Sequence, residues 1–291
     1  MRLRISDTLN FYLRQQKYRW RAIRWASFAG RATSFVFTVQ PGLKMRLYGD
    51  SEICRHIYCS HFENVERAFL NSFLQPGDVF IDVGANIGLF TLIAASRVGP
   101  TGQVIAFEPT TATYRRLLHN VQMNKFQQVK CFQLALSNSN GALDLIQSVD
   151  GFDAWNSLAR PTMGKAFTSE RVDAVAWDQH AKQHGLIGSV TMMKIDVEGW
   201  ETRVLSGGKE IFARPDAPVL QVEFSDGAAS AAGVSCHVLY RTLESFGYRM
   251  SVYKPEIRAI VPDSIREEYP YVNLIAAKNP DFVNARLSAA H

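Results

Sequence analysis

The sequence of 291 residues lacks several features that would place it in other classes of protein. It has no run of about 18 apolar residues, so we expect no membrane-spanning helix. Its basic N-terminus is not followed by an apolar segment with a small-residue cleavage site, so we expect no secretory signal. The four cysteines show no CxxC spacing, which favours reduced thiols in a cytoplasmic protein.

Basic residues are in excess only within the first 31 positions. There, eight lysines and arginines face a single acid, Asp7, so this segment carries a formal charge of +7, whereas the whole chain carries +5 and the remainder −2. The remainder therefore has no electrostatic footprint for nucleic acid. One helical face of the basic segment holds Leu9, Tyr12, Leu13, Gln16, Trp20 and Ile23. Two interpretations stay open for residues 1–34: a helical arm that contacts an anionic membrane or a partner, or a helix packed on its own domain.

Strands and helices are predicted to alternate from residue 76 onward. We expect strands at 79–83, 103–108, 129–136, 190–196 and 217–224, and helices at 87–97, 110–124 and 198–206. This alternation indicates an α/β fold with a doubly wound, mostly parallel sheet. Two short strands within 35–48 and a helix at 62–74 form an N-terminal extension. The predicted units are the arm 1–34, the extension 35–75, the main domain 76–280 and a C-terminal tail 281–291.

The turn after the first strand of the sheet, in VFIDVGANIGLF, limits the choice of cofactor. A dinucleotide requires G-x-G-x-x-G for its pyrophosphate, but here only Gly84 and Gly88 are present and their spacing is G-x-x-x-G. No GK[ST] follows, which excludes a Walker loop. S-adenosylmethionine (SAM) carries no phosphate and suits an acidic strand end followed by a tight turn. Asp82 is placed to face its ammonium group, and Glu108 to accept hydrogen bonds from its ribose hydroxyls.

A structural alternative is that the glycines only form a turn and that the acids cap helices. Against it, the segments FIDVGANIG, VIAFEPTTATYRRLLHN, LALSNSNGALDL and MKIDVEGWETRVLSGG resemble the FkbM family of class I SAM-dependent methyltransferases. The resemblance covers roughly residues 43–225. It implies a Rossmann-like fold, SAM as methyl donor, S-adenosylhomocysteine as product, and O-methylation of a hydroxyl on a small molecule, sugar or lipid-like compound. The cofactor-binding residues that it implies are Asp82, Gly84, Asn86, Gly88, Glu108, Ala135, Leu136 and Ser137. We expect Ala85 of the same turn, and Asp196 at the end of a later strand, to contact the cofactor as well.

Three acids near the ends of the later strands are candidates for catalysis. Asp196 is expected to orient or deprotonate the acceptor, with Glu198 and Glu223 in support. Asp196 could also serve as an N-cap, with Glu198 as a favourable charge in the first helical turn. Asp196 and Glu223 together could hold a divalent ion, but no third ligand is evident, and we predict no metal site. Lys194 shares a strand face with Asp196 and is expected to be paired with an acid, not to be catalytic.

The segment CRHIYCSH places two cysteines and two histidines close together. Residues 53–58 are expected to form a strand, with Cys54 and His56 on one face and Cys59 on the other. This arrangement favours ordinary packing over a zinc site. His56 or His61 would be available as a base if either lay near the acceptor.

Two further groups of side chains permit structural as well as functional interpretations. His180 and His184 lie one helical turn apart and are interpreted as a solvated helix face. The aromatic residues of the polar loop 148–170 either line the acceptor pocket or form local core; they are Phe152, Trp155 and Phe167.

Two rival functions differ from methyl transfer. A non-catalytic binding or scaffold protein would keep the fold and act through its basic arm, but the intact DVGANIG and FEP segments argue against it. An NAD-dependent enzyme would use a similar sheet, but the missing glycine argues against that. The sequence therefore predicts a SAM-dependent methyltransferase of the cytoplasm, with membrane contact through residues 1–31 left open.

Overall fold

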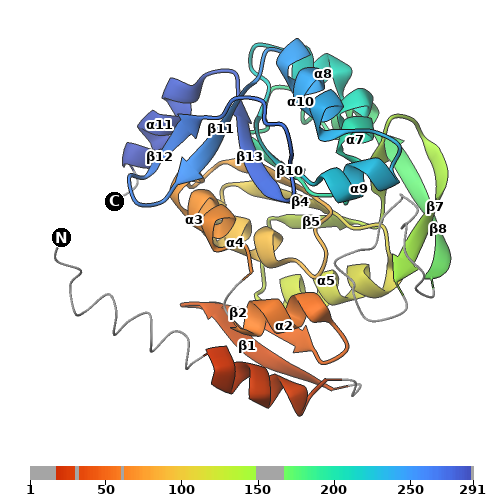
Figure 1. The fold of residues 1–291 in the computed structure, drawn as a ribbon. Helices are drawn as coiled ribbons and strands as arrows, with labels where there is room; N and C mark the ends of the chain where they lie inside the picture. The colour runs from red at the N-terminus through yellow and green to blue at the C-terminus, as the bar shows by residue number, and fades with distance from the viewer. Residues whose placement is uncertain (1–17, 30–32, 60–61, 149–166, 290–291) are drawn as a thin grey trace.

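The computed structural model describes residues 18–29, 33–59, 62–148 and 167–289 (Figure 1). Its centre is an eight-stranded sheet in the order β12-β11-β13-β10-β9-β3-β4-β5. The five strands from β10 to β5 are parallel, and β11, β12 and β13 pair antiparallel at the other edge. The strands are β3 Val79–Val83, β4 Gln103–Phe107, β5 Val129–Phe132, β9 Met192–Ile195, β10 Val219–Phe224, β11 Arg249–Lys254, β12 Ala259–Pro262 and β13 Val272–Ala277. The predicted α/β fold with a mostly parallel sheet is confirmed.

Helices cover both faces of the sheet, so its strands are buried on both sides. Phe80 packs into the core on one face, and its neighbour Ile81 packs into the core on the other. The first core receives α3 Asn64–Phe73, α4 Leu89–Val98, α5 Thr111–Met123 and α11 Pro280–Ala289. The second receives α6 Trp177–Gln183, α7 Glu201–Gly207, α8 Lys209–Ala213, α9 Asp226–Ala231 and α10 Cys236–Ser245. Among the described residues, no helix is both long and apolar enough to cross a bilayer.

The N-terminal extension is a hairpin of β1 Ser34–Gln40 and β2 Leu43–Tyr48, followed by α2 Glu52–Cys59. Figure 1 shows it at the end of the molecule opposite α7, α8 and α10. The strand expected at 53–58 is wrong, because apolar side chains at 53, 54, 57 and 58 share one helical face and are buried. Cys54 and Cys59 are free thiols in this core.

The basic arm is described from residue 18, where 18–26 are helical. Trp25 is 3% exposed and packs edge-on against Phe35 of β1. Trp20 and Ile23 belong to the face predicted to be apolar, yet they are 61% and 74% exposed. The described helix therefore docks on its own domain through a face different from the predicted one. The other members of that predicted face lie outside the described residues.

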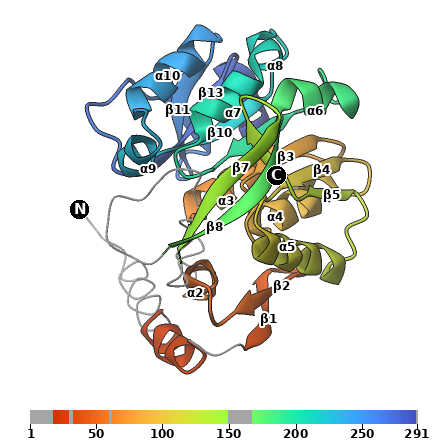
Figure 2. The same cartoon turned by 90° about the vertical axis from the view of Figure 1, so that its right-hand side faces the viewer.

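A small sheet adjoins the central one. It contains β6 Ala135–Ser137, β8 Phe167–Ala176 and β7 Gly141–Ser148, in that order. Strands β7 and β8 run side by side as a long antiparallel hairpin (Figure 2). The strand expected over 129–136 is divided, since β5 belongs to the central sheet and β6 to the small one. Residues 149–166, which include Phe152 and Trp155, lie outside the described residues, and the side chain of Phe167 is not described.

Two other segments differ from expectation. His180 of α6 is buried between the rings of Phe107 and Phe132, at centroid distances of 4.8 Å, so its predicted place on a solvated face is wrong. Of the two histidines, only His184 is exposed. The C-terminal residues expected to form a tail build α11, whose Val283 and Leu287 are buried.

Candidate active site

The site lies where the order of the parallel strands reverses. Strand β3 pairs with β4 on one side and with β9 on the other. From β3 the sheet continues to β4 and β5 in one direction, and from β9 it continues to β10 in the other. Crevices beyond the carboxyl ends of strands at such a point are the usual ligand sites of open α/β sheets. Here that crevice is a cavity of about 440 Å³. Its size is within the range of small-molecule sites.

Most of the residues predicted for the site line this cavity. They are Gly84, Ala85, Asn86, Glu108, Ala135, Leu136, Asp196, Glu198 and Glu223. Three members of the predicted cofactor set are not among the lining residues: Asp82, Gly88 and Ser137. Each of these three is next in sequence to a residue that does line the cavity.

The turn after β3 is packed against the end of β9. Gly84 has φ of +79°, and a Cβ atom there would overlap the backbone carbonyl oxygen of Asp196. The amides of Gly84 and Ala85 both donate to the carbonyl oxygen of Phe107, at 3.1 and 2.9 Å. Gly88 has φ of +95°, and a Cβ atom there would lie 2.7 Å from a methyl group of Leu117. The glycines therefore let the turn approach neighbouring protein segments, in addition to any ligand.

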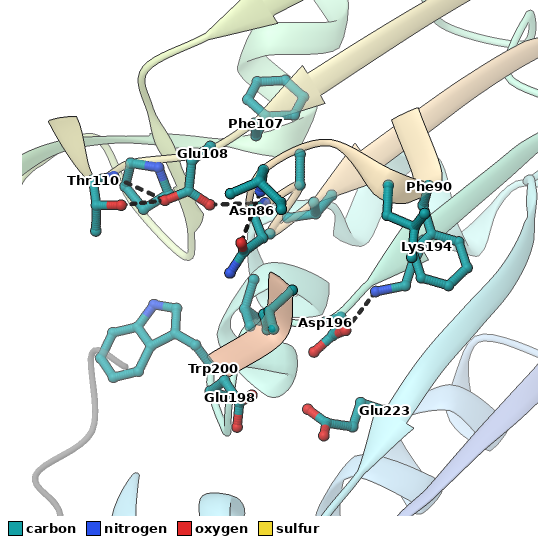
Figure 3. A pocket seen from close by; sticks show the side chains of 18 of the residues that line it. Asn86, Phe90, Phe107, Glu108, Thr110, Lys194, Asp196, Glu198, Trp200 and Glu223 are labelled. Carbon is teal, nitrogen blue, oxygen red and sulfur yellow. Dashed lines mark hydrogen bonds and ion pairs between the residues drawn. The ribbon is translucent and has the colours of Figure 1, made fainter. Parts of the chain in front are cut away.

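Glu108 connects this turn to the end of β4. Its Oε2 accepts a hydrogen bond from the amide of Asn86 at 3.0 Å (Figure 3). Its Oε1 accepts from the amide and the hydroxyl of Thr110, at 3.0 and 2.6 Å. Burial raises the pKa of Glu108 to about 7, although these hydrogen bonds oppose the rise. A carboxylate oxygen can accept more than one hydrogen bond, so Oε2 can still accept a bond from a hydroxyl in the cavity.

Asp82 and Ser137 act behind the wall. Oδ2 of Asp82 accepts a hydrogen bond from the hydroxyl of Thr91 at 2.6 Å, whereas its buried Oδ1 has no partner among the described residues. Burial raises the pKa of Asp82, and Lys194 opposes this. Ser137 accepts a hydrogen bond from the indole nitrogen of Trp200, which lines the cavity. Direct contact of Asp82 with a ligand stays a prediction.

Asp196, Glu198 and Glu223 converge in one part of the cavity (Figure 3). One oxygen from each lies within 4.8 Å of the others. Nζ of Lys194 is 2.5 Å from Oδ2 of Asp196 and 4.6 Å from the ring centroid of Phe90. Burial, followed by the charge of Asp196, raises the pKa of both Glu198 and Glu223 well above the ordinary value. Burial lowers the pKa of Lys194, but the surrounding carboxylates outweigh it, so the pKa is raised and the ammonium form is favoured.

Asp196 does not cap a helix. The helix expected from residue 198 begins at Glu201, and its N-cap residue, Trp200, makes no side-chain cap hydrogen bond. Glu201 instead accepts hydrogen bonds from the amides of Val197 and Gly199, at 3.1 and 3.2 Å. The alternative interpretation, in which Asp196 serves as the N-cap of this helix, is therefore wrong.

Several lining residues were not predicted. Tyr271, next to β13, donates a hydrogen bond to Oε1 of Glu63 at 2.7 Å, and both side chains line the cavity. Phe62 lines it from the N-terminal extension. His56, considered above as a base if it lay near the acceptor, also lines the cavity, and its use as a base stays a prediction. The sequence around Phe62 and Glu63 did not indicate that these residues line the cavity, because the position of the extension over the sheet depends on tertiary packing. His61 lies outside the described residues.

The lining is strongly acidic. Six carboxylates, those of Glu52, Glu63, Glu108, Asp196, Glu198 and Glu223, face one lysine and one histidine. Such a cavity repels a pyrophosphate and attracts a cation, so it fits the sulfonium and ammonium groups of SAM better than NAD. The sheet order and this cavity are those expected of an α/β methyltransferase.

Comparison with known proteins identifies the particular family. Residues 82–250, more than half of the chain, match the profile of the methyltransferase FkbM domain, and the chain belongs to this family. It is 25% identical over 194 residues to the 2-O-methyltransferase NoeI of Sinorhizobium fredii, covering 62% of this chain and 77% of the relative. It is 32% identical over 183 residues to the 31-O-demethyl-FK506 methyltransferase FkbM of Streptomyces tacrolimicus, covering 53% and 69%.

Among solved structures, TYW2 of M. jannaschii in complex with AdoMet aligns at 13% identity and a TM-score of 0.43, covering 85% of each chain. The family assignment confirms the predicted resemblance. The protein is a SAM-dependent methyltransferase, and neither the scaffold alternative nor the NAD-dependent alternative is supported.

Proposed function

We propose that this enzyme transfers the methyl group of SAM to a hydroxyl oxygen of a small-molecule acceptor such as a sugar or a lipid-like compound. The observation that carries the proposal is the carboxylate of Asp196, which lies in the cavity at the end of β9 and is held by Lys194. Two relatives named for O-methylation support the choice of oxygen. The near-neutral body of the chain argues against nucleic acid as the acceptor.

The cavity offers separate places for the cofactor and the acceptor. We assign the cofactor to the turn Gly84–Asn86, to Glu108, and to Ala135 and Leu136, with Asp82, Gly88 and Ser137 supporting that wall. Bound there, SAM supplies an activated methyl group, so the protein mainly has to align the acceptor oxygen with it. The acceptor would enter beside Tyr271.

Asp196 is the residue assigned to the acceptor hydroxyl. The hydroxyl must lose its proton as its oxygen attacks, and a carboxylate within hydrogen-bond reach can accept that proton. The ion pair with Lys194 fixes the direction of the Asp196 side chain. Glu198 and Glu223 would complete the polar end of the acceptor site.

The experiment uses SAM with an isotope-labelled methyl group, incubated with fractions of hydroxyl-bearing metabolites and followed by mass spectrometry of the labelled product. Asp196→Asn should bind S-adenosylhomocysteine as the wild type does but lose at least about a hundredfold in turnover. Asp216→Asn, at an exposed carboxylate outside the cavity, is the control. Labelling of nitrogen or carbon would refute O-methylation, and full turnover in Asp196→Asn would refute the role of Asp196.

We further propose that the enzyme works in the cytoplasm and that residues 1–31 contact an anionic membrane or a partner protein. In the described part of this arm, Trp20 and Ile23 are exposed and Arg24 lies 5.4 Å from the Trp20 ring centroid. Exposed apolar side chains beside arginines suit an anionic surface. Sedimentation with anionic lipid vesicles, compared between the wild type and Trp20→Ser, tests this, and equal sedimentation would refute it.

A further inference from the structure

Three carboxylates from different segments converge in one part of the cavity. Asp196 follows β9, Glu223 belongs to β10, and Glu198 lies in the loop before α7 with φ of +52°. This left-handed conformation turns the loop so that Glu198 faces the ends of both strands (Figure 3). One oxygen of each residue lies within 4.8 Å of the others, which is close enough for all three to bind one ion.

Glu223 provides independent evidence for a ligand. It is only 4% exposed, and its Oε2 has no hydrogen-bond partner among the described residues. A buried carboxylate oxygen without a partner is costly, so such atoms usually mark a bound water, ion or ligand. The side chain points toward Asp196 and Glu198 (Figure 3).

The charges also favour a cation. Among the lining residues, Lys194 supplies the one ammonium group, and its Nζ is paired with Oδ2 of Asp196. One ammonium group is therefore shared by three neighbouring carboxylates. Carboxylates this close together in a buried site repel one another, and the repulsion is relieved by taking up a proton or by binding a cation.

We propose that Asp196, Glu198 and Glu223 bind one divalent cation that prefers oxygen ligands, such as Mg²⁺ or Mn²⁺, and that this cation binds the acceptor. The proposal rests on the proposed function, because it assigns the ion a role in holding the acceptor. A six-coordinate ion with three carboxylate ligands keeps about three positions for water or substrate. An acceptor with two adjacent oxygens, a vicinal diol or an α-hydroxy acid, would fill two of them.

The ion and the proposed base are compatible. The three carboxylates have six oxygens, so oxygens not bound to the ion remain available to accept the hydroxyl proton. As the new O–CH₃ bond forms, the S–CH₃ bond of the donor breaks, its electron pair stays on sulfur, and the proton passes to a carboxylate. The ion would stabilise the developing negative charge on the acceptor oxygen.

A titration of the purified full-length protein with Mn²⁺, with free Mn²⁺ measured by electron paramagnetic resonance, tests the site directly. The wild type should show one saturable site per chain below about 1 mM. Glu198→Gln and Glu223→Gln should each weaken Mn²⁺ binding at least about tenfold. The matched control is Glu244→Gln, at an exposed carboxylate of α10 paired with Arg241, and it should bind Mn²⁺ as the wild type does.

Two results would overturn the proposal: no saturable site in the wild type, or unchanged Mn²⁺ affinity in both cavity variants. Thermal melting shows whether the variants are folded, and the less buried Glu198 keeps the test valid if Glu223→Gln unfolds.

Calorimetry with S-adenosylhomocysteine on the same samples separates the two proposals. If Mn²⁺ binding depends on Glu198 but no hydroxyl is ever labelled, the ion site stands and the proposed function fails. If a hydroxyl is labelled equally well with excess EDTA, the ion's role with the acceptor is refuted while O-methylation stands.

Discussion

A single methyl group added at Gly84 tests how tightly the turn after β3 packs against the end of β9. In Gly84→Ala, the residue keeps φ of +79° only at a cost of about 1–2 kcal/mol, because alanine disfavours the left-handed region. The new Cβ atom would also overlap the carbonyl oxygen of Asp196 and lie 3.3 Å from Cγ1 of Val197. Moving two backbone segments apart costs about 1–3 kcal/mol more. We therefore expect the free energy of unfolding to fall by about 2–5 kcal/mol in urea titrations.

The matched control is Gly185→Ala. Gly185 has φ of +65°, but nothing lies within 4 Å of the position of its Cβ atom, so this variant bears the conformational cost alone. The difference between the two variants measures the overlap with Asp196. Gly84→Ala should also weaken binding of S-adenosylhomocysteine in calorimetry at least about tenfold, because the displaced turn lines the cavity. Equal stability loss in both variants, with cofactor affinity unchanged, would refute this account of the turn.

The remaining predictions concern a cavity carboxylate and a buried histidine. Glu108→Gln should weaken S-adenosylhomocysteine binding at least about tenfold in calorimetry, because an amide nitrogen cannot accept the hydrogen bonds of Asn86 or Thr110; unchanged affinity would contradict it. Burial lowers the pKa of His180 from 6.5 to about 4, so the folded state binds fewer protons than the unfolded state between these values. The free energy of unfolding should therefore fall by about 3 kcal/mol as the pH drops from 6.5 to 4. His180→Phe should remove this part of the slope, and an unaltered slope would exclude His180 as its source.

The strands of the central sheet were predictable because their residues follow simple rules. The mostly apolar segments 79–83 and 217–224 each carry an acid one residue before their last, Asp82 and Glu223, which is typical of buried parallel strands that stop at a ligand site. The two acids at strand ends, Asp196 and Glu223, were predictable for the same reason. Carboxyl ends of neighbouring parallel strands must meet at one edge of the sheet.

Glu198 was predicted to support Asp196, but the turn that brings it to the ends of both strands could not be predicted in this way. A helix starting at residue 198 would have directed Glu198 along the helix, but the chain takes a left-handed turn there and begins α7 three residues later. Tyr271 and Glu63 meet across 208 positions of sequence, and no local pattern reports such a contact. His180 was misinterpreted because a histidine pair at helical spacing says nothing about which aromatic rings cover it.

The measurement that tests the central claim most directly is a crystal structure of the protein with S-adenosylhomocysteine bound. The account predicts the ligand in the cavity at the ends of β3, β4 and β9, with its ribose hydroxyls on the carboxylate of Glu108 and its sulfur facing Asp196. A ligand bound elsewhere, or bound in the cavity without contact to Glu108, would contradict it.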